Sequence, residues 1–327
     1  MLFRSGGKND LKDKVIRCVG NPDTRFNEDA LRILRALRFA SVYGFSIEEN
    51  TSKSIFKNAD LLKNIATERV ISEFLKLICG KDAVKILDAY RETIAVIIPE
   101  ITVMFNFNQN NIHHSYDLWQ HTLTALGTIE PNPILRMTML LHDIGKPSVK
   151  TTDNSGQSHF QGHQLESKKI ADRILHRLRL PSDFINKTLL LIEYHDVRFN
   201  GSKKLMKKVM NVLGTDLTKQ LLEVEYADIS AQSEYQREEK LGYLETAKTH
   251  LNEIIKDNEC FKLSQLDING KDVLNLGVKE GRDVGNILDY LLMLVVDANV
   301  PNKKSILISK AKRSEERRVG KECRSRW

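Results

Sequence analysis

Apolar residues recur at helical spacing along most of the chain, whereas the alternation typical of strands is scarce. The amphipathic stretches predict helices over residues 27–43, 67–79, 81–91, 117–129, 133–143, 163–178, 182–195, 203–213, 216–234, 239–257 and 284–298. Between residues 150 and 160, around Gly156, the pattern leaves room for a short hairpin at most. Many amphipathic helices with almost no strands predict an all-α chain.

The first of these helices has well-marked ends in the sequence. Asn27 is expected to be its N-cap, and Glu28 and Asp29 are expected in its first turn. Gly44 is expected to follow its last residue. We therefore expect one continuous helix over residues 27–43.

The chain is expected to divide into a helical neck and body, a central helical bundle and a small helical tail. The neck and body are predicted over residues 6–90, the central bundle over residues 91–257, and the tail module over residues 258–312. Residues 1–5 and 313–327 lack an amphipathic pattern and have the character of non-native additions.

The composition is that of a soluble globular protein, with 41% hydrophobic and 28% charged residues. The net charge is +7, but the final fifteen residues hold six basic and three acidic side chains. Without them and the opening MLFRS, the chain is only mildly basic. Any surface that binds nucleic acid must therefore be local.

The cysteines favour a reducing compartment. Only Cys18, Cys79, Cys260 and Cys323 occur, widely spaced and without a CxxC motif. This pattern argues against a disulfide framework and against a zinc site built from cysteines, so the cytoplasm is the expected location. No apolar run reaches the length of a membrane span, and no membrane partner is expected.

Eight of the nine histidines lie between residues 113 and 195. Between residues 121 and 228 the chain contains a series of residues of the types that bind metal ions: His121, His142, Asp143, His163, His195 and Asp228. Imidazole nitrogens combined with carboxylate oxygens suit Mn, Fe, Ni, Co or Zn. A single histidine in a helical protein is usually structural or solvated. The joint pattern indicates a metal site.

The order of these residues, and above all the segment LHDIGKP, resembles the HD-domain superfamily of metal-dependent phosphohydrolases. The resemblance implies a set of ligands for a divalent metal: His121, His142, Asp143 and Asp228. It matches two further residues to histidines that hold a second metal or contact phosphate: His163 and His195. It also implies catalytic roles for Asp143 and for Lys146, which is well placed for a substrate phosphate. The implied reaction is metal-assisted hydrolysis of a phosphate ester.

The predicted helix over residues 27–43 carries a basic stripe, because Arg32, Arg35 and Arg38 recur every third residue. Composition alone would allow a solvated face in which Arg32 pairs with Asp29. The segment RFNEDALRILRALRFA, however, resembles the neck of the class II tRNA nucleotidyltransferases, or CCA-adding enzymes, and of the related bacterial poly(A) polymerases.

That family selects nucleotides with a Glu-Asp-x-x-Arg motif, which corresponds here to residues 28–32. The resemblance implies that Asp29 and Arg32 read the base of ATP or CTP. Cytosine and adenine both present an amino donor beside a ring-nitrogen acceptor, whereas uracil and guanine reverse that order. A carboxylate that accepts and a guanidinium that donates fit the first pair and reject the second. Arg35 and Arg38 would then face the nucleotide phosphates or the RNA end.

Two further segments extend the resemblance over about residues 6–312. ATERVISEFLKLICGKDAVKIL is similar to the next neck motif, in which Glu68, Arg69 and Glu73 would brace the helices. LDINGKDVLNLGVKEGRDVGNILDYLLMLVVD is similar to a tail module that contacts tRNA, although a plain helical hairpin also fits its spacing.

Members of this family begin with a nucleotidyltransferase head, whose paired carboxylates hold Mg²⁺. The opening GGKNDLKDKVIRCVGNP resembles only the last piece of that head. We therefore expect a fragment of a larger enzyme that does not transfer nucleotides by itself. Its HD domain is expected to hydrolyse phosphate esters such as 2′,3′-cyclic phosphates, and the implied partners are the tRNA 3′ end, ATP and CTP.

Two other functions fit the same sequence. The chain could be a non-catalytic module that binds tRNA through its basic neck and its tail. It could also be a stand-alone HD phosphohydrolase that acts on free nucleotides and only resembles the tRNA enzymes. Metal-stimulated hydrolysis and affinity for tRNA distinguish the three functions.

Overall fold

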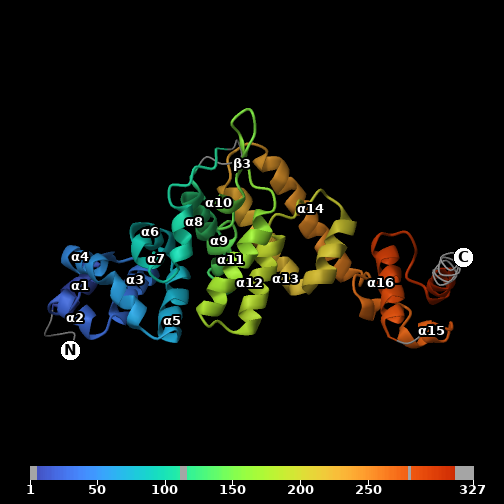
Figure 1. Ribbon diagram of the computed structural model, residues 1–327, viewed down its shortest axis with the longest axis horizontal. Coiled ribbons are helices and arrows are strands. Elements are labelled where there is room, and N and C mark those ends of the chain that lie inside the picture. Colours follow the sequence, from blue (N-terminus) through green and yellow to red (C-terminus); the bar gives the residue numbers. More distant parts are fainter. Residues whose placement is uncertain (1–5, 111–115, 279–280, 314–327) are drawn as a thin grey trace, which may run out of the picture. The chain divides into compact units, whose positions relative to one another are not determined.

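The computed structural model describes residues 6–110, 116–278 and 281–313, and these are predominantly helical, as predicted (Figure 1). The chain forms two compact units. The first contains the residues up to Val197 together with Gln220–Leu241. The second contains Arg198–Lys219 and the residues from Gly242 onward. The division into neck, HD domain and tail stays a prediction.

The first unit begins with helices and two short strands: α1 (Gly7–Asp13), β1 (Val15–Ile16), α2 (Pro22–Glu28), α3 (Leu31–Tyr43), β2 (Ser46–Ile47) and α4 (Glu49–Asn58). The strands pair in parallel, with Val15 opposite Ser46, and this pairing was not predicted. The parallel pair ties the segment before α2 to the segment after α3.

The continuous helix predicted over residues 27–43 is wrong at its start. Its N-terminal part belongs to α2, which is capped by Asn21 instead of Asn27. Asp29 has an extended backbone (φ −153°, ψ 99°) and separates α2 from α3. Its carboxylate accepts a hydrogen bond of 3.2 Å from the backbone N–H of Leu31, which replaces the continuing helical bond. Gly44 ends α3 in the left-handed region (φ 69°), as predicted.

The next elements of this unit are η1 (Ala59–Asn64), α5 (Thr67–Ile78), α6 (Ala83–Ala89), α7 (Arg91–Ala95) and η2 (Pro99–Met104). α3 and α5 pack together through fully buried side chains such as Leu37 and Phe74. A Cβ atom on Gly80 would lie 2.1 Å from Oγ of Ser41 and 2.6 Å from its carbonyl carbon. Glycine is therefore required where α5 ends against α3.

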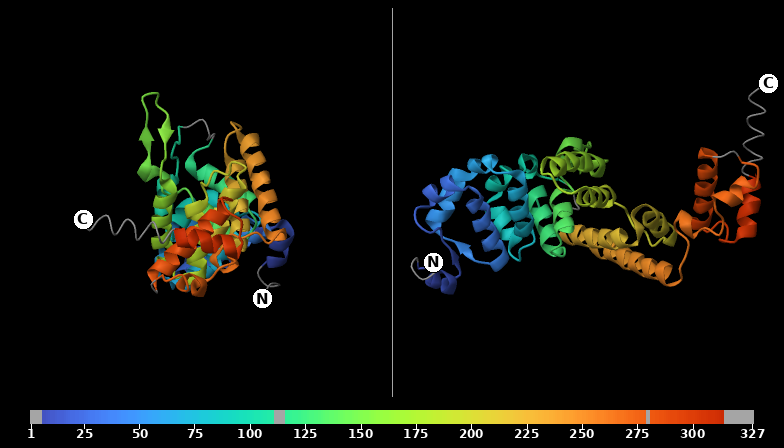
Figure 2. Two further views of the ribbon diagram at one scale, coloured as in Figure 1. Left: turned by 90° about the vertical axis from the view of Figure 1, so that its right-hand side faces the viewer. Right: turned by 90° about the horizontal axis from the view of Figure 1, so that it is seen from below.

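The remainder of the first unit holds α8 (Leu118–Thr128), α9 (Pro133–Leu141), α10 (Lys146–Val149), β3 (Thr151–Thr152), β4 (Ser158–His159), α11 (His163–Arg177) and α12 (Ser182–Tyr194). The C-terminal part of α13 (Lys203–Ala231) also belongs to it. β3 and β4 form the short antiparallel hairpin expected from the sequence, with Thr151 opposite His159. The hairpin projects beyond the neighbouring helices (Figures 1 and 2).

The second unit contains the N-terminal part of α13, most of α14 (Arg237–Lys256), η3 (Leu263–Gln265), α15 (Gly270–Leu274) and α16 (Arg282–Val296). A kink at Gly214 (φ 72°, ψ 175°) interrupts α13 between the two helices predicted there. Val273, Leu291 and Leu307 lie fully buried in the core of this unit. None of the described helices is long and apolar enough to cross a membrane.

Candidate metal centre and neck pocket

The metal-type residues of the sequence come from separate elements of the first unit and meet in its interior. His121 lies on α8, His142 and Asp143 directly follow α9, His163 opens α11, His195 directly follows α12, and Asp228 lies on α13. Their ligand atoms form two overlapping groups, each within 4.8 Å: His121, His142, Asp143 and Asp228; and Asp143, His163 and His195. Asp143 belongs to both groups. We refer to the two groups together as the metal centre.

The metal centre is shielded from solvent. His121 and His142 are 0% exposed and Asp143 is 1% exposed. Among the residues that the structure describes, neither Nε2 of His142 nor Oδ1 of Asp143 forms a hydrogen bond of ordinary geometry. Buried polar atoms of this kind are costly unless a cation or a further donor satisfies them.

The imidazoles are oriented by the backbone. In each ring Nδ1 lies within hydrogen-bond distance of a carbonyl oxygen: His121 with Ala231 (3.3 Å), His142 with Met139 (2.7 Å), His163 with Phe160 (2.9 Å) and His195 with Ile192 (2.7 Å). Because a carbonyl only accepts, Nδ1 must carry the hydrogen, and Nε2 of the neutral ring keeps its lone pair. This is the tautomer in which histidine binds a metal through Nε2.

The distances between these atoms suit shared coordination. Nε2 of His121 lies 2.9 Å from Oδ1 of Asp228, and Nε2 of His142 lies 3.2 Å from Oδ2 of Asp143. Nε2 of His163 lies 3.2 Å from Oδ1 of Asp143 and 3.1 Å from Nε2 of His195. Two ligand atoms that each lie about 2.1 Å from one ion are roughly 3 Å apart. Asp143 thus directs Oδ2 to one group and Oδ1 to the other, an arrangement suited to bridging two ions.

The titration properties show how strongly the groups act on one another. Burial would raise the pKa of Asp143, but the charges of His142 and Lys146 hold it well below its usual range. Burial would lower the pKa of His142, but the charges of Asp143 and Asp228 raise it to about 10. The carboxylates therefore demand positive charge, which protons on the imidazoles or a metal cation would supply.

Lys146, predicted to contact a substrate phosphate, opens α10 beside the metal centre. Its side chain is only 7% exposed, and Nζ lies 2.6 Å from Oδ2 of Asp143. Nζ also donates to Oε1 of Gln109 (3.2 Å), whose side chain is fully buried. Sequence reasoning missed Gln109, because nothing in the polar stretch NFNQNN distinguishes it from its neighbours.

A second residue missed from the sequence is Glu225, one turn before Asp228 on α13. Burial, followed by the charges of Asp228 and Asp196, raises its pKa well above the usual range. Its Oε1 has no hydrogen-bond partner among the described residues. Burial among other acids therefore favours the protonated form of this side chain. The sequence did offer one indication of Glu225: it precedes the predicted ligand Asp228 by three residues, which places both on the same face of a helix.

The basic stripe of α3 lies in a different part of the first unit. Nη1 of Arg32 donates to Glu28 (2.8 Å) and to the carbonyl oxygen of Arg25 (2.8 Å). The suggested pairing of Arg32 with Asp29 is wrong, because Asp29 lies in the extended break before α3. Asp29 instead accepts from Nη2 of Arg69 (3.2 Å) on α5.

The three residues predicted to brace the neck all form ion pairs between elements. Arg69 pairs with Asp29, Glu73 with Arg38 (3.1 Å), and Glu68 with Arg179 (2.6 Å). Arg69 and Glu73 thus hold two of the residues predicted to bind nucleotide. Arg35 is exposed and forms no ion pair in the described part of the chain. Whether these residues bind nucleotide stays a prediction.

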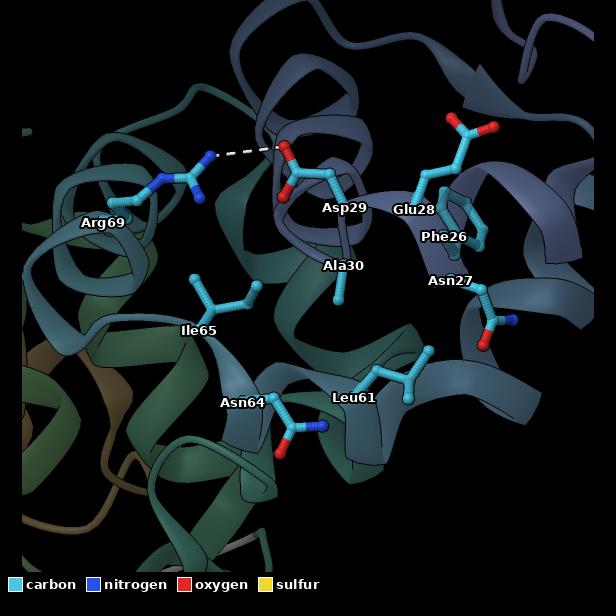
Figure 3. Close-up of a pocket in the computed structure, with 9 residues that line it drawn as sticks. All are labelled: Phe26, Asn27, Glu28, Asp29, Ala30, Leu61, Asn64, Ile65 and Arg69. Carbon is cyan, nitrogen blue, oxygen red and sulfur yellow. Dashed lines mark hydrogen bonds and ion pairs between the residues drawn. The ribbon is translucent and has the colours of Figure 1, made fainter.

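Asp29 also lines a pocket of about 370 Å³ in the neck (Figure 3). The walls come from α2, the break before α3, η1 and the start of α5: Phe26, Asn27, Glu28, Asp29, Ala30, Leu61, Asn64, Ile65 and Arg69. Figure 3 shows the carboxylate of Asp29 and the guanidinium of Arg69 side by side. An acceptor and a donor are therefore adjacent at this pocket, although the donor is Arg69 and Arg32 is not among the lining residues.

Known proteins share this arrangement of helices and parts of its sequence. Residues 44–105 match a family model described as "Probable RNA and SrmB- binding site of polymerase A", and residues 163–311 match tRNA nucleotidyltransferase domain 2. A CCA-adding enzyme of Ligilactobacillus salivarius is 28% identical over 322 residues, which are 96% of this chain and 66% of that protein. The chain is thus similar to tRNA nucleotidyltransferases over most of its length.

Further tRNA nucleotidyltransferases show the same similarity. The CC-adding tRNA nucleotidyltransferase of Thermus thermophilus is 28% identical over 91% of this chain and 69% of its own length. The crystal structure of the Bacillus stearothermophilus CCA-adding enzyme in complex with CTP has the same fold, with a TM-score of 0.65 and 22% identity. It aligns with 96% of this chain and 69% of its own. The chain thus spans about two thirds of the length of these relatives.

Proposed function

We propose that this chain acts in tRNA 3′-end processing and that its metal centre hydrolyses phosphate esters at RNA ends, such as 2′,3′-cyclic phosphates. The observation that carries the hydrolase assignment is the convergence of buried imidazoles and carboxylates on a common point. The tRNA assignment is supported by the similarity to tRNA nucleotidyltransferases over 96% of the chain.

The donor set fits one or two divalent transition metals, such as Mn, Fe, Ni, Co or Zn. One ion would be held by His121, His142, Asp143 and Asp228, and a second by Asp143, His163 and His195. When bound, such ions supply Lewis acidity that activates a phosphate ester and the water that attacks it. Asp143 holds the two groups together, and the backbone carbonyls keep each imidazole in its ligand tautomer.

Lys146 would complete the site for a phosphate. Its ammonium group is held beside Asp143 by Gln109, so that its position does not depend on solvent-exposed contacts. A fixed positive charge at the edge of the metal centre favours an anionic substrate and the charge that develops on its oxygens.

The neck would contribute contacts to nucleotide and RNA. Asp29 and Arg32 would read the base of CTP or ATP, Arg35 and Arg38 would face phosphates, and Arg69 and Glu73 would position them. The Bacillus stearothermophilus enzyme with the same fold was solved with CTP, which supports a nucleotide as a partner of this fold.

The hydrolase proposal is tested with the variants His142→Ala and Asp143→Ala. Purified protein loaded with Mn²⁺, Ni²⁺ or Zn²⁺ is assayed on a tRNA that ends in a 2′,3′-cyclic phosphate. Hydrolysis and bound metal are both expected to fall by more than about 100-fold. Removing a metal ligand should lower metal affinity by more than removing a residue that only orients a ligand, which costs about 10–100-fold. His176→Ala is the matched control, because His176 is an exposed residue of α11.

The outcomes separate the three functions. Unchanged metal content and unchanged hydrolysis in both variants would reject the metal centre as the active site. Binding of tRNA without any metal-stimulated hydrolysis would favour a non-catalytic module. Turnover of free mononucleotides without affinity for tRNA would favour a stand-alone nucleotidase.

A further inference from the structure

An exposed strip of α3 contains Arg35, for which the proposed function expects a phosphate contact, and apolar residues to which neither site gives a role. It consists of Arg35, Phe39, Val42 and Tyr43, is continued by Phe45 after the helix, and is called the α3 strip below. These helical positions lie on one face, because residues three and four apart are neighbours on a helix. Val42 is 39% and Tyr43 53% exposed. Neighbouring exposed apolar side chains of this kind indicate a surface for a binding partner.

The aromatic rings of the α3 strip are arranged as a column. The rings of Phe39 and Tyr43 stack with 5.9 Å between centroids and an interplanar angle of 18°. Phe45 lies beside this stacked pair, with its ring 5.8 Å from that of Tyr43 and tilted by 46°. The guanidinium of Arg38 lies 4.2 Å over Phe39. Such π surfaces stack with any nucleobase, whatever its sequence.

The charge around the column is positive. α3 carries Arg32, Arg35 and Arg38 and has no acidic residue between Leu31 and Tyr43. Arg32 and Arg38 are partly neutralised by Glu28 and Glu73, whereas Arg35 forms no ion pair within the described ranges. Arg35 lies one turn before Phe39. A guanidinium one turn from an aromatic ring can hold a phosphate while the adjoining base stacks.

A second aromatic pair in the same unit differs from the α3 strip in the charges beside it. Phe56 on α4 is 47% exposed and stacks on Tyr90 with 5.1 Å between centroids and an angle of 15°. The cations of α4 are both paired, Lys53 with Glu49 and Lys57 with Asp23. At α4 an exposed ring thus stacks on a buried one beside paired cations, whereas the stacked rings of the α3 strip lie beside a cation that is unpaired among the described residues.

We propose that the α3 strip binds a single RNA strand, with unpaired bases stacked against Tyr43 and Phe39 and a phosphate held by Arg35. The occupant is single-stranded because bases in a duplex are already stacked and paired. The strip adjoins residues 44–105, which match the RNA-binding family model. The inference deepens the proposed function, since the strand would be the unpaired 3′ end of a tRNA.

The test measures binding of a fluorescently labelled, single-stranded RNA decamer by anisotropy at several salt concentrations. Tyr43→Leu is expected to weaken binding by roughly tenfold, because one stacked base contributes about 1–3 kcal/mol. Arg35→Gln is expected to reduce the salt slope by about one phosphate contact. Phe56→Leu, the matched control, is expected to leave the affinity unchanged.

Two further measurements keep the proposal falsifiable. Tyr43→Trp preserves the stacking surface and is expected to retain affinity, so a folding defect in Tyr43→Leu would be recognised. Duplex RNA of the same sequence is expected to bind without sensitivity to residue 43. Unchanged single-strand affinity in both Tyr43→Leu and Arg35→Gln would overturn the proposal and leave the strip to a protein partner.

The α3 strip and the hydrolase can fail separately. Cyclic-phosphate hydrolysis is measured with the same variants on a small cyclic mononucleotide, which has no second base to stack on the strip. Loss of RNA binding with intact hydrolysis supports the strip alone. Absent hydrolysis in the unaltered protein, with RNA binding that depends on Tyr43, rejects only the hydrolase.

Discussion

The metal centre and the neck pocket are each built around an aspartate, and the two aspartates have opposite surroundings. Asp143 is 1% exposed and is held by imidazoles and an ammonium group from several elements. The side chain of Asp29 is 28% exposed and is paired with a single guanidinium at 3.2 Å. A buried carboxylate requires a cation nearby, whereas a partly exposed one can exchange its ion-pair partner for a ligand.

Because Asp143 is buried within the metal centre, we expect its substitution to have a large effect that is confined to this site. Asp143→Asn keeps the shape of the side chain but removes the charge shared by both groups of ligands. Metal content and hydrolysis are expected to fall by more than about 100-fold. Plasma mass spectrometry of the purified protein and the cyclic-phosphate assay measure this.

The same variant tests the independence of the neck. RNA affinity of Asp143→Asn should match that of the unaltered protein. Asp172→Asn is the control, because the side chain of Asp172 on α11 is 50% exposed. A parallel loss of RNA binding would show that the two regions depend on one another.

A smaller effect is expected from Gln109, which reaches the metal centre only through Lys146. Gln109→Leu removes the oxygen that accepts from Nζ of Lys146 (3.2 Å). Hydrolysis is expected to fall by about 10–100-fold, the range for residues that orient a group in contact with the substrate. The loss should appear mainly in kcat/KM, with the metal content unchanged.

Gln157→Leu, on the β3–β4 hairpin, serves as the control for Gln109→Leu. Gln109→Glu offers a second comparison, because it restores an acceptor for Lys146 and should recover part of the activity. Full activity in Gln109→Leu would show that Lys146 needs no support.

In the neck, Asp29→Ala is expected to lower stability by about 1 kcal/mol, since it removes the acceptor for the N–H of Leu31 at the start of α3. Asp29→Asn keeps an acceptor oxygen and should cost less. Thermal unfolding followed by circular dichroism compares the two. Equal stability of Asp29→Ala and the unaltered protein would mean that the break between α2 and α3 does not depend on this cap.

The smallest effect concerns Asp23, which joins α2 to α4. Hydrogen bonds from Lys57 and Ser54 outweigh desolvation and lower its pKa to about 2, compared with about 3.8 for a free carboxyl. Its stabilising contribution is therefore complete above about pH 4 and is lost as the pH falls through about 2. Asp23→Asn should lower the Tm slightly at pH 7, and this effect should shrink as the pH falls through about 2.

Most of the helical fold could be predicted from the sequence, because amphipathic periodicity is a local property. The break at Asp29 was missed for the same reason: the apolar spacing runs through it, and the hydrogen bond that makes the break is formed by a side chain. The parallel pairing of Val15 with Ser46 depends on a contact across 31 residues, which no local pattern reports.

The metal centre shows where sequence reasoning succeeds and where it ends. Its residue types and chain order, through the resemblance they carry, were enough to nominate the side chains that the fold brings together. Gln109 and Glu225 were not nominated, since a glutamine in a polar stretch and a glutamate in a helix are ordinary residues. Only burial against Lys146 and beside Asp228 makes them distinctive.

The close approach at Gly80 has a consequence for the neck as a whole. The backbone of Ser41 leaves no space for even a methyl group there, so α3 and α5 are locked at a single separation. The contacts from α5 to Asp29 and to Arg38 share that separation. The absence of a side chain at Gly80 therefore fixes the distance between α3 and α5. A larger residue at this position would force the helices apart and lengthen both ion pairs, Asp29–Arg69 and Arg38–Glu73.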